Sequence, residues 1–388
     1  MISSVKAKQI SDSRGKKTIK VELNTGLGKF SASVPSGTSR GKHEAVERPA
    51  AAAASRVNNT ICLKIKGRNP ANQKEIDDFL IKLDSTKRKS RLGANAVLGV
   101  SMAVCRAGAK EKNLALWKWI SKIAGTKPKM PRPCLLQVEG GKHGKTRLDI
   151  QEFMAAADGR TFKERLAAGT KTYKSLGKYF TDTGLEGAFV PKNKKTEELL
   201  ELLTRKARKS KIFIDAAANS FYRKGKYCFE GKKLTAKELL SFYLDIIKRH
   251  PIIAVEDPFA EQDWKSWQQM VLEIKKRKLN TLIVGDDLTV TNPARIRQAR
   301  EKKACNAVII KPNQIGTVSE TIVAVKLAKS FGWKIIVSHR SGETMDDFIA
   351  DLAVGVAADF IKSGAPSKPE RMSKYNRLLK IEKELCRN

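Results

Sequence analysis

The first part of the chain alternates apolar and polar residues in short runs separated by glycine-containing turns. Alternation of this kind is typical of strands with one buried face, and it predicts strands at residues 5–10, 18–23 and 29–34. From residue 43 to about residue 124 the apolar positions recur at helical spacing instead. We therefore expect an N-terminal α+β domain, a strand meander followed by helices.

The second part of the chain repeats a different unit, a short β-rich apolar run followed by a helical segment. The runs lie at residues 211–214, 252–255, 281–284, 307–310, 334–337 and 358–361. This alternation predicts parallel βα units, and their number favours a closed (β/α)8-type TIM barrel, an α/β fold, over an open sheet. The proline-rich, basic segment 127–133 predicts a domain boundary. The expected organisation is an N-terminal α+β capping domain at residues 1–130 and a TIM-like barrel catalytic domain at residues 131–388.

Residues of catalytic types stand directly after these runs. In chain order they are Asp215, Glu256, Asp286, Lys311, His339 and Lys362. Charged residues can simply mark strand ends, but the C-terminal ends of parallel barrel strands meet at one mouth, where six such side chains would converge. The three carboxylates offer the hard oxygen ligands that magnesium prefers and zinc does not. Beside them, desolvation and positive charge would lower the pKa of Lys311, as a lysine general base requires.

Several motifs resemble those of the enolase family. They are Val-Glu-Asp-Pro-Phe at 255–259, Gly-Asp-Asp-Leu-Thr-Val-Thr-Asn-Pro at 285–293, Ile-Lys-Pro-Asn-Gln-Ile-Gly at 310–316, Ser-His-Arg-Ser-Gly-Glu-Thr at 338–344 and Ile-Lys-Ser-Gly-Ala-Pro at 361–366. Residues 34–41 resemble the mobile loop of the family, and residues 93–101 resemble its first long helix. The resemblance covers nearly the whole chain. It implies the enolase fold and a magnesium-dependent lyase that reversibly dehydrates 2-phosphoglycerate to phosphoenolpyruvate in glycolysis and gluconeogenesis.

The resemblance also implies a role for each matching residue. Asp215, Glu256 and Asp286 would hold the first of two magnesium ions, and Ser39 would help to bind the second. Lys311 would remove the proton from carbon 2 of the substrate. Glu186 would protonate the departing 3-hydroxyl, with Glu152 beside it, and mutual repulsion would keep one of these two carboxyls protonated near neutrality. The remaining catalytic or substrate-binding residues would be His143, Gln151 and His339, with Arg340 and Ser341 on the phosphate and Lys362 on the substrate carboxylate.

The chain departs from the family pattern at three places. The family motif Gly-Asp-Glu-Gly-Gly reads Gly-Leu-Glu-Gly-Ala at 184–188, so the aspartate before Glu186 is replaced by Leu185. Residues 139–145 read Glu-Gly-Gly-Lys-His-Gly-Lys where the family has Asn-Gly-Gly-Ser-His-Ala-Gly. The chain is also shorter than most of the family, with trimming indicated before residue 184 and within 201–211, where loops would tolerate it. These changes leave open an alternative, a catalytically weak enolase-like protein with a binding role.

The amino-acid composition gives the chain an unusually large positive charge. The chain has 388 residues, of which 76 are Lys or Arg and 40 are Asp or Glu, for a net charge of +36. Such a charge attracts anions, and it predicts nonspecific, salt-sensitive contact with nucleic acid. Aromatic residues are not interleaved with the basic clusters, which argues against a base-stacking platform. A lysine-rich proteome or an unusual ionic environment is the other explanation for the charge.

Composition and targeting signals also narrow the class of protein. The 41% of hydrophobic residues exclude a mostly disordered chain. The six cysteines form no Cys-x-x-Cys pair, which argues against a zinc site or a disulfide framework. We find neither a secretory signal pattern nor an apolar stretch long enough to span a membrane. We therefore expect a cytoplasmic protein, and the resemblance implies a homo-oligomer, a dimer or an octamer.

Overall fold

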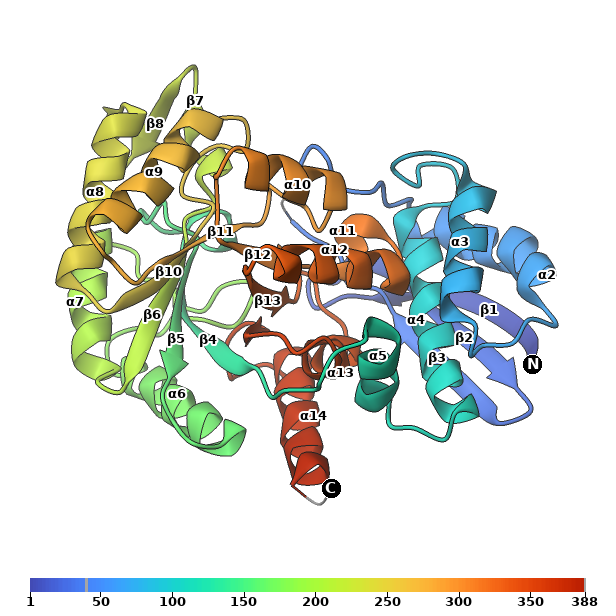
Figure 1. Ribbon diagram of the computed structural model, residues 1–388. Coiled ribbons are helices and arrows are strands. Elements are labelled where there is room, and N and C mark those ends of the chain that lie inside the picture. The colour runs from blue at the N-terminus through green and yellow to red at the C-terminus, as the bar shows by residue number, and fades with distance from the viewer. Residues whose placement is uncertain (39–40, 387–388) are drawn as a thin grey trace.

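A computed structural model describes residues 1–38 and 41–386 of the chain. An N-terminal part built on a small sheet lies beside a barrel surrounded by helices, and the last helix projects from the barrel (Figure 1). Among the described residues, no helix combines the length and the apolar character needed to cross a bilayer.

The N-terminal part is an antiparallel sheet covered by helices, and its three predicted strands are confirmed. The strands are β1 (Ile2–Ser11), β2 (Lys17–Thr25) and β3 (Gly28–Ser33), paired in that order. The helices are α1 (Ala50–Arg56), the π-helix η1 (Val57–Ile61), α2 (Cys62–Ile65), α3 (Gln73–Asp84), α4 (Ala94–Glu111) and α5 (Leu116–Ala124). Ile19, Val21 and Leu23 alternate along β2 and are fully buried. Gly99 of α4 lets the helix approach Val21 so closely that a Cβ at position 99 would lie 2.6 Å from its methyl group.

Eight strands close the barrel in the second part. They are β4 (Arg132–Glu139), β5 (Glu152–Ala157), β6 (Ser210–Asp215), β10 (Ile252–Glu256), β11 (Leu282–Gly285), β12 (Ala307–Ile310), β13 (Lys334–Ser338) and β14 (Phe360–Lys362). The spatial order is β10-β11-β12-β13-β14-β4-β5-β6. The last six strands along the chain match the predicted runs, so the barrel is confirmed. All six residues of β5 are buried, so this strand shows no alternation and the sequence pattern did not predict it.

One strand of the barrel runs against the expected direction. β5 is antiparallel to both β4 and β6, whereas the other neighbouring pairs are parallel. The predicted runs themselves, β6 and β10 to β14, pair in parallel as expected, and the reversed strand β5 was not among them. The reversal puts the first residue of β5 at the mouth where the other strands end. As a result Glu139, Glu152, Asp215 and Glu256 stand in register on four adjacent strands.

The second part also contains helices, most of which surround the barrel, and a small three-stranded sheet lies between β6 and β10 along the chain. The helices are η2 (Gly141–His143), α6 (Phe162–Leu176), α7 (Thr196–Lys206), η3 (Ala218–Ser220), α8 (Ala236–Arg249), α9 (Trp264–Lys276), α10 (Pro293–Glu301), α11 (Pro312–Ile315), α12 (Val318–Ser330), α13 (Phe348–Gly355) and α14 (Pro369–Leu385). The small sheet consists of β7 (Tyr222–Arg223), β8 (Lys226–Phe229) and β9 (Lys232–Leu234). Thr161 and Thr235 start α6 and α8 with capping boxes, which satisfy free backbone donors at both helix starts.

Candidate active site

A polar cavity of about 380 Å³ lies at the mouth of the barrel. It brings together eleven of the residues selected from the sequence: His143, Gln151, Glu152, Glu186, Asp215, Asp286, Lys311, His339, Arg340, Ser341 and Lys362. Glu256 lies against the Lys362 ammonium group at the same mouth. Gly37 and Glu44 from the N-terminal part also line the cavity, so both parts of the chain build it. Ser39 lies outside the described residues.

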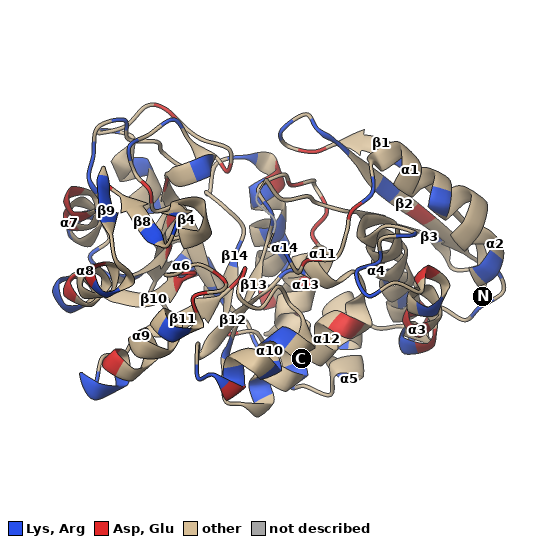
Figure 2. Ribbon diagram, turned by 90° about the horizontal axis from the view of Figure 1, so that it is seen from above, with Lys and Arg blue, Asp and Glu red and all other residues tan. Residues whose placement is uncertain are grey.

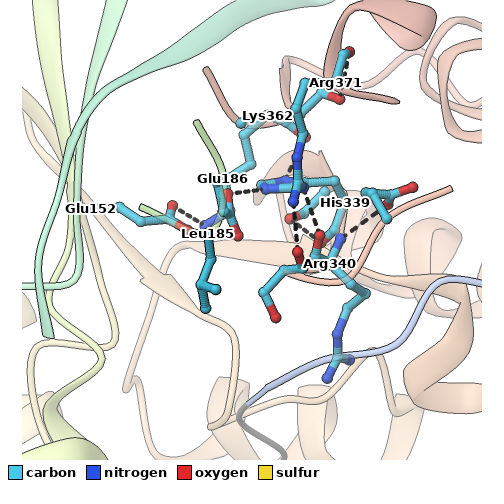
Figure 3. A network of polar contacts seen from close by, with 12 residues as sticks. Glu152, Leu185, Glu186, His339, Arg340, Lys362 and Arg371 are labelled. Carbon is cyan, nitrogen blue, oxygen red and sulfur yellow. Dashed lines mark hydrogen bonds and ion pairs between the residues drawn. The ribbon is translucent and has the colours of Figure 1, made fainter. Parts of the chain in front are cut away.

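The ammonium group of Lys362 holds three of the carboxylates together. Its Nζ atom lies 3.0 Å from Glu152 Oε2, 3.4 Å from Asp215 Oδ2 and 2.8 Å from Glu256 Oε2 (Figure 3 shows the contact with Glu152). All four side chains are buried. Burial and neighbouring carboxylates raise the pKa of Asp215 to about 6 and that of Glu256 well above its ordinary range, although Lys362 opposes both shifts. Three carboxyl groups in this cluster thus share one ammonium group.

A second ion pair joins Lys311 to Asp286. The Nζ atom of Lys311 contacts Asp286 Oδ2, and the side-chain amide of Gln314 donates to Asp286 Oδ1 at 2.9 Å. Burial alone would lower the pKa of Lys311, but the pairing with Asp286 outweighs it and the pKa is raised. The expected lowering is thus not found while the pair is intact. While it is paired with Asp286, Lys311 therefore favours its protonated form.

The acidic residues of the mouth fit a hard divalent cation. Glu152, Asp215, Glu256 and Asp286 are four buried carboxylates that face two ammonium groups, those of Lys362 and Lys311. Their donor atoms are all oxygen, as magnesium prefers. Oxygen atoms of Asp257, Asp286 and Asp287 also lie close enough together to share one ion. The oxygen donors and the excess of carboxyl over ammonium groups agree with a divalent cation beside Asp286.

Glu186 forms a buried pair with His339. The carboxylate Oε2 contacts Nε2 of the imidazole, and Nδ1 of the same ring lies 3.1 Å from the carbonyl oxygen of Lys362 (Figure 3). Because a carbonyl oxygen can only accept, Nδ1 carries a hydrogen, and the pair holds its proton between Nε2 and Oε2. Burial raises the pKa of Glu186, but His339 and Arg371 outweigh it, so the pKa lies well below its ordinary value. The upward shift expected for one of the paired carboxyls is therefore not found at Glu186.

Arg340 and Ser341 face the part of the cavity nearest the N-terminal domain. Nη1 of Arg340 lies 2.9 Å from Glu44 Oε2, and the Ser341 hydroxyl donates to Thr38 Oγ1 at 2.8 Å. Arg371 donates to the backbone carbonyls of residues 340 and 341 at 2.7 and 2.6 Å (Figure 3). Glu44 and Arg371 were not selected from the sequence, because nothing in their local pattern shows which distant groups they meet.

Glu139 was also not selected as a site residue. It is fully buried at the end of β4, opposite Glu152, and its side chain accepts hydrogen bonds from backbone N–H groups of Glu186 and Ala188. Burial and the nearby Glu186 raise the pKa of Glu139 to about 8. The replacement of an amide by a carboxyl at this position was a signal in the sequence, but its partner lies 47 residues away along the chain.

Comparison with known proteins agrees with this geometry. The family model described as "Enolase, N-terminal domain" matches residues 2–120, and the one described as "Enolase, C-terminal TIM barrel domain" matches residues 127–388. The chain is 43% identical to "Enolase 1" of Entamoeba histolytica, over 99% of this chain and 96% of that protein. It is 45% identical to "Enolase B" of Dictyostelium discoideum, over 99% and 95%. Both alignments extend over 423 positions, more than the 388 residues of the chain, so the chain carries deletions relative to both proteins.

Proposed function

The chain belongs to the enolase family and is a carbon–oxygen hydro-lyase, and we propose that Lys311 and Glu186 are the base and the acid with which it interconverts 2-phosphoglycerate and phosphoenolpyruvate. One observation carries the assignment. A single buried cavity is lined by an amine base, a carboxyl–imidazole pair and an arginine–serine pair that suits a phosphate. The reaction needs these three functions at once.

Lys311 is suited to remove the proton from carbon 2 of the substrate. It follows β12 at the mouth, contacts Asp286 and lines the cavity. Breaking the Lys311–Asp286 pair removes the interaction that raises the pKa of this lysine, and burial then favours its neutral form. The electron pair left on carbon 2 passes into the substrate carboxylate, whose charge the ammonium group of Lys362 would face.

Glu186 is suited to protonate the departing 3-hydroxyl. The Glu186–His339 pair holds a proton that a leaving hydroxide can take up from the carboxyl oxygen. Loss of water then completes the double bond between carbons 2 and 3. Glu152 and His143 lie close by, with His143 Nδ1 3.8 Å from Glu186 Oε1 and 3.9 Å from Glu152 Oε1. We assign both to the orientation of this end of the substrate, together with Gln151.

The phosphate would bind to Arg340 and Ser341. The guanidinium group is paired with Glu44, so phosphate binding must displace that carboxylate or share the guanidinium with it. Arg371 fixes the backbone of both residues, which keeps their side chains directed at the cavity. A planar guanidinium group matches the oxygens of a phosphate better than an amine does.

Two magnesium ions complete the proposal. Asp215, Glu256 and Asp286 would hold the first ion, and Ser39 is assigned to the second. When bound, the ions stabilise the negative charge that develops on the substrate carboxylate. Burial first, and then repulsion from neighbouring carboxylates, raises the pKa of Asp215 and Glu256, and a bound cation would offset both effects.

The test is phosphoenolpyruvate formation from 2-phosphoglycerate, followed by ultraviolet absorbance. We expect metal-dependent activity that a chelator abolishes and that is lost in Lys311→Ala. The matched control is Lys334→Ala, because Lys334 forms an exposed ion pair with Asp359 on the outside of the barrel. Folded, magnesium-loaded protein without activity would contradict the proposal and favour the alternative, a catalytically weak protein with a binding role.

The remaining assignments concern the whole molecule. We propose a cytoplasmic homo-oligomer with a domain division near residue 130. Lys and Arg lie on elements of both the barrel and the N-terminal part (Figure 2), so nonspecific contact with nucleic acid stays a prediction. Binding of a DNA or RNA duplex measured against salt concentration tests it. Absence of binding at moderate salt would contradict this prediction without affecting the enzymatic proposal.

A further inference from the structure

The loop that carries Glu186 is tied to the barrel through its own peptide groups. Every backbone N–H from Gly184 to Ala188 has an acceptor. Those of Gly184 and Gly187 are used within the loop, and that of Leu185 donates to the carbonyl oxygen of His143 at 3.1 Å. The remaining two N–H groups, those of Glu186 and Ala188, donate to the side chain of Glu139 at distances of 2.9 to 3.1 Å. One side chain on β4 therefore anchors the peptide of the proposed acid.

Glu139 also meets a second residue of the site. Its Oε2 atom lies 3.7 Å from Nδ1 of His143, a buried nitrogen that has no hydrogen-bond partner among the described residues. The fit around the carboxyl is close, since a Cβ added at Gly184 would lie 2.5 Å from its Cδ atom. The Glu139 carboxyl is thus packed against Gly184 while it binds the peptide groups of Glu186 and Ala188.

Leu185 cannot supply this anchor. It occupies the position at which the motif resembled by residues 184–188 has an aspartate, and its side chain has no atom that accepts a hydrogen bond. In Figure 3 the side chain of Leu185 takes part in none of the marked contacts, whereas the neighbouring Glu186 reaches His339. The carboxyl group that binds the loop of Glu186 therefore comes from a distant part of the chain, from Glu139 at the end of β4.

We propose that Glu139 is a positioning residue of the dehydration step, which holds Glu186 in place through two peptide N–H groups and borders His143. This inference rests on the proposed function of Glu186. It concerns the step that breaks the bond between carbon 3 and its hydroxyl oxygen. It does not concern the removal of the carbon 2 proton by Lys311. That residue directly follows β12.

The two steps can be measured separately. In deuterium oxide, Lys311 would remove the carbon 2 proton of 2-phosphoglycerate and return a deuteron, with no carbon–oxygen bond broken; nuclear magnetic resonance follows this exchange. Dehydration requires in addition that Glu186 gives a proton to the hydroxyl oxygen, which leaves as water while the electron pair on carbon 2 forms the double bond. Ultraviolet absorbance of phosphoenolpyruvate follows this second step.

We expect Glu139→Leu to lower the rate of dehydration about 10- to 100-fold, because it leaves two buried N–H groups without an acceptor and loosens the acid. The exchange rate and the KM should stay within about threefold of the unmodified protein, since Lys311 and the phosphate-binding residues are untouched. Glu139→Gln keeps one carbonyl acceptor and should restore dehydration to within about threefold. Gln137→Leu, a buried polar residue on the same strand, is the control and should leave the ratio of the two rates unchanged.

Three further outcomes test the role of Glu139 and the proposed function on which it rests. If Glu139→Leu lowers exchange and dehydration equally, or neither of them, Glu139 does not position the acid. If this variant fails to fold, Glu139→Asp, whose shorter side chain withdraws the carboxyl from the loop, must show the same selective loss or the inference is wrong. If the unmodified protein neither exchanges nor dehydrates, the proposed function itself fails.

Discussion

Glu152 and Asp215 lie directly opposite each other on the antiparallel strands β5 and β6. One residue begins its strand and the other ends its strand, yet both stand at the same mouth and both are reached by the ammonium group of Lys362. The reversed direction of β5 therefore decides that a residue at the start of a strand belongs to the site.

Removal of the proposed base should abolish turnover while leaving binding intact. Lys311→Ala is expected to lower kcat by about 10²- to 10⁴-fold, the usual contribution of a general base, with KM changed much less. Steady-state kinetics with 2-phosphoglycerate measures both constants. A parallel rise in KM and fall in kcat/KM at unchanged kcat would show that Lys311 binds the substrate and does not act as the base.

Replacement of Lys362 should destabilise the metal-free protein. Lys362→Met leaves Glu152, Asp215 and Glu256 buried without their shared ammonium group, which should cost about 3–5 kcal/mol of unfolding free energy. Urea denaturation in the presence of a chelator measures the loss. Lys334→Met, which breaks an exposed ion pair, is the control and should cost about 0–1 kcal/mol. Equal losses in the two variants would contradict the buried charge cluster.

The titration of Glu139 should appear in the pH dependence of stability. The pKa of Glu139 is about 8 in the folded protein against an ordinary value of 4.5, so the folded state binds its proton more tightly than the unfolded state. The contribution of Glu139 to stability is therefore present at acidic pH and is lost as the pH rises through this interval. Glu139→Gln cannot titrate, and its Tm relative to the unmodified protein should rise by several degrees between about pH 5 and pH 8. A Tm difference that is independent of pH would contradict the raised pKa.

Helix capping should contribute to stability without affecting catalysis. The Thr235 hydroxyl accepts from the backbone N–H of Glu238, and the Glu238 carboxylate accepts from the backbone N–H of Thr235. Thr235→Ala should lower the unfolding free energy by about 1 kcal/mol and leave kcat unchanged. Thr235→Ser keeps the hydroxyl and serves as the matched control. Equal loss in the alanine and serine variants would indicate that the methyl group, and not the cap, matters.

Much of the site could be predicted because it follows strand ends. Asp215 and Glu256 are the last residues of β6 and β10, and Lys311 directly follows β12. In a closed barrel the ends of neighbouring strands lie about 5 Å apart, so adjacent strand ends imply adjacent side chains. Predicting this part of the site required the apolar runs and the residue after each of them, and nothing about long-range packing.

The charge states could not be predicted in the same way. The sequence led us to expect a lowered pKa for Lys311 and a raised pKa that keeps one of the carboxyls of Glu186 and Glu152 protonated. The structure instead pairs Lys311 with Asp286 and Glu186 with His339, and these pairs favour the charged forms of Lys311 and Glu186. A pKa depends on which groups lie within a few ångströms, and neither partner is a near neighbour along the chain.

The sequence by itself determined the alternation of strands and helices, the residues at the barrel mouth and the family, because periodicity, strand ends and motifs are local properties of the chain. Only the tertiary structure decided that β5 runs backwards, that Glu44 and Arg371 meet Arg340 and Ser341, and that Glu139 binds the loop of Glu186. Each of these depends on contacts between segments far apart in the sequence. Such contacts follow from how the whole chain packs, because burial of the strands and satisfaction of their polar groups are achieved by all elements together.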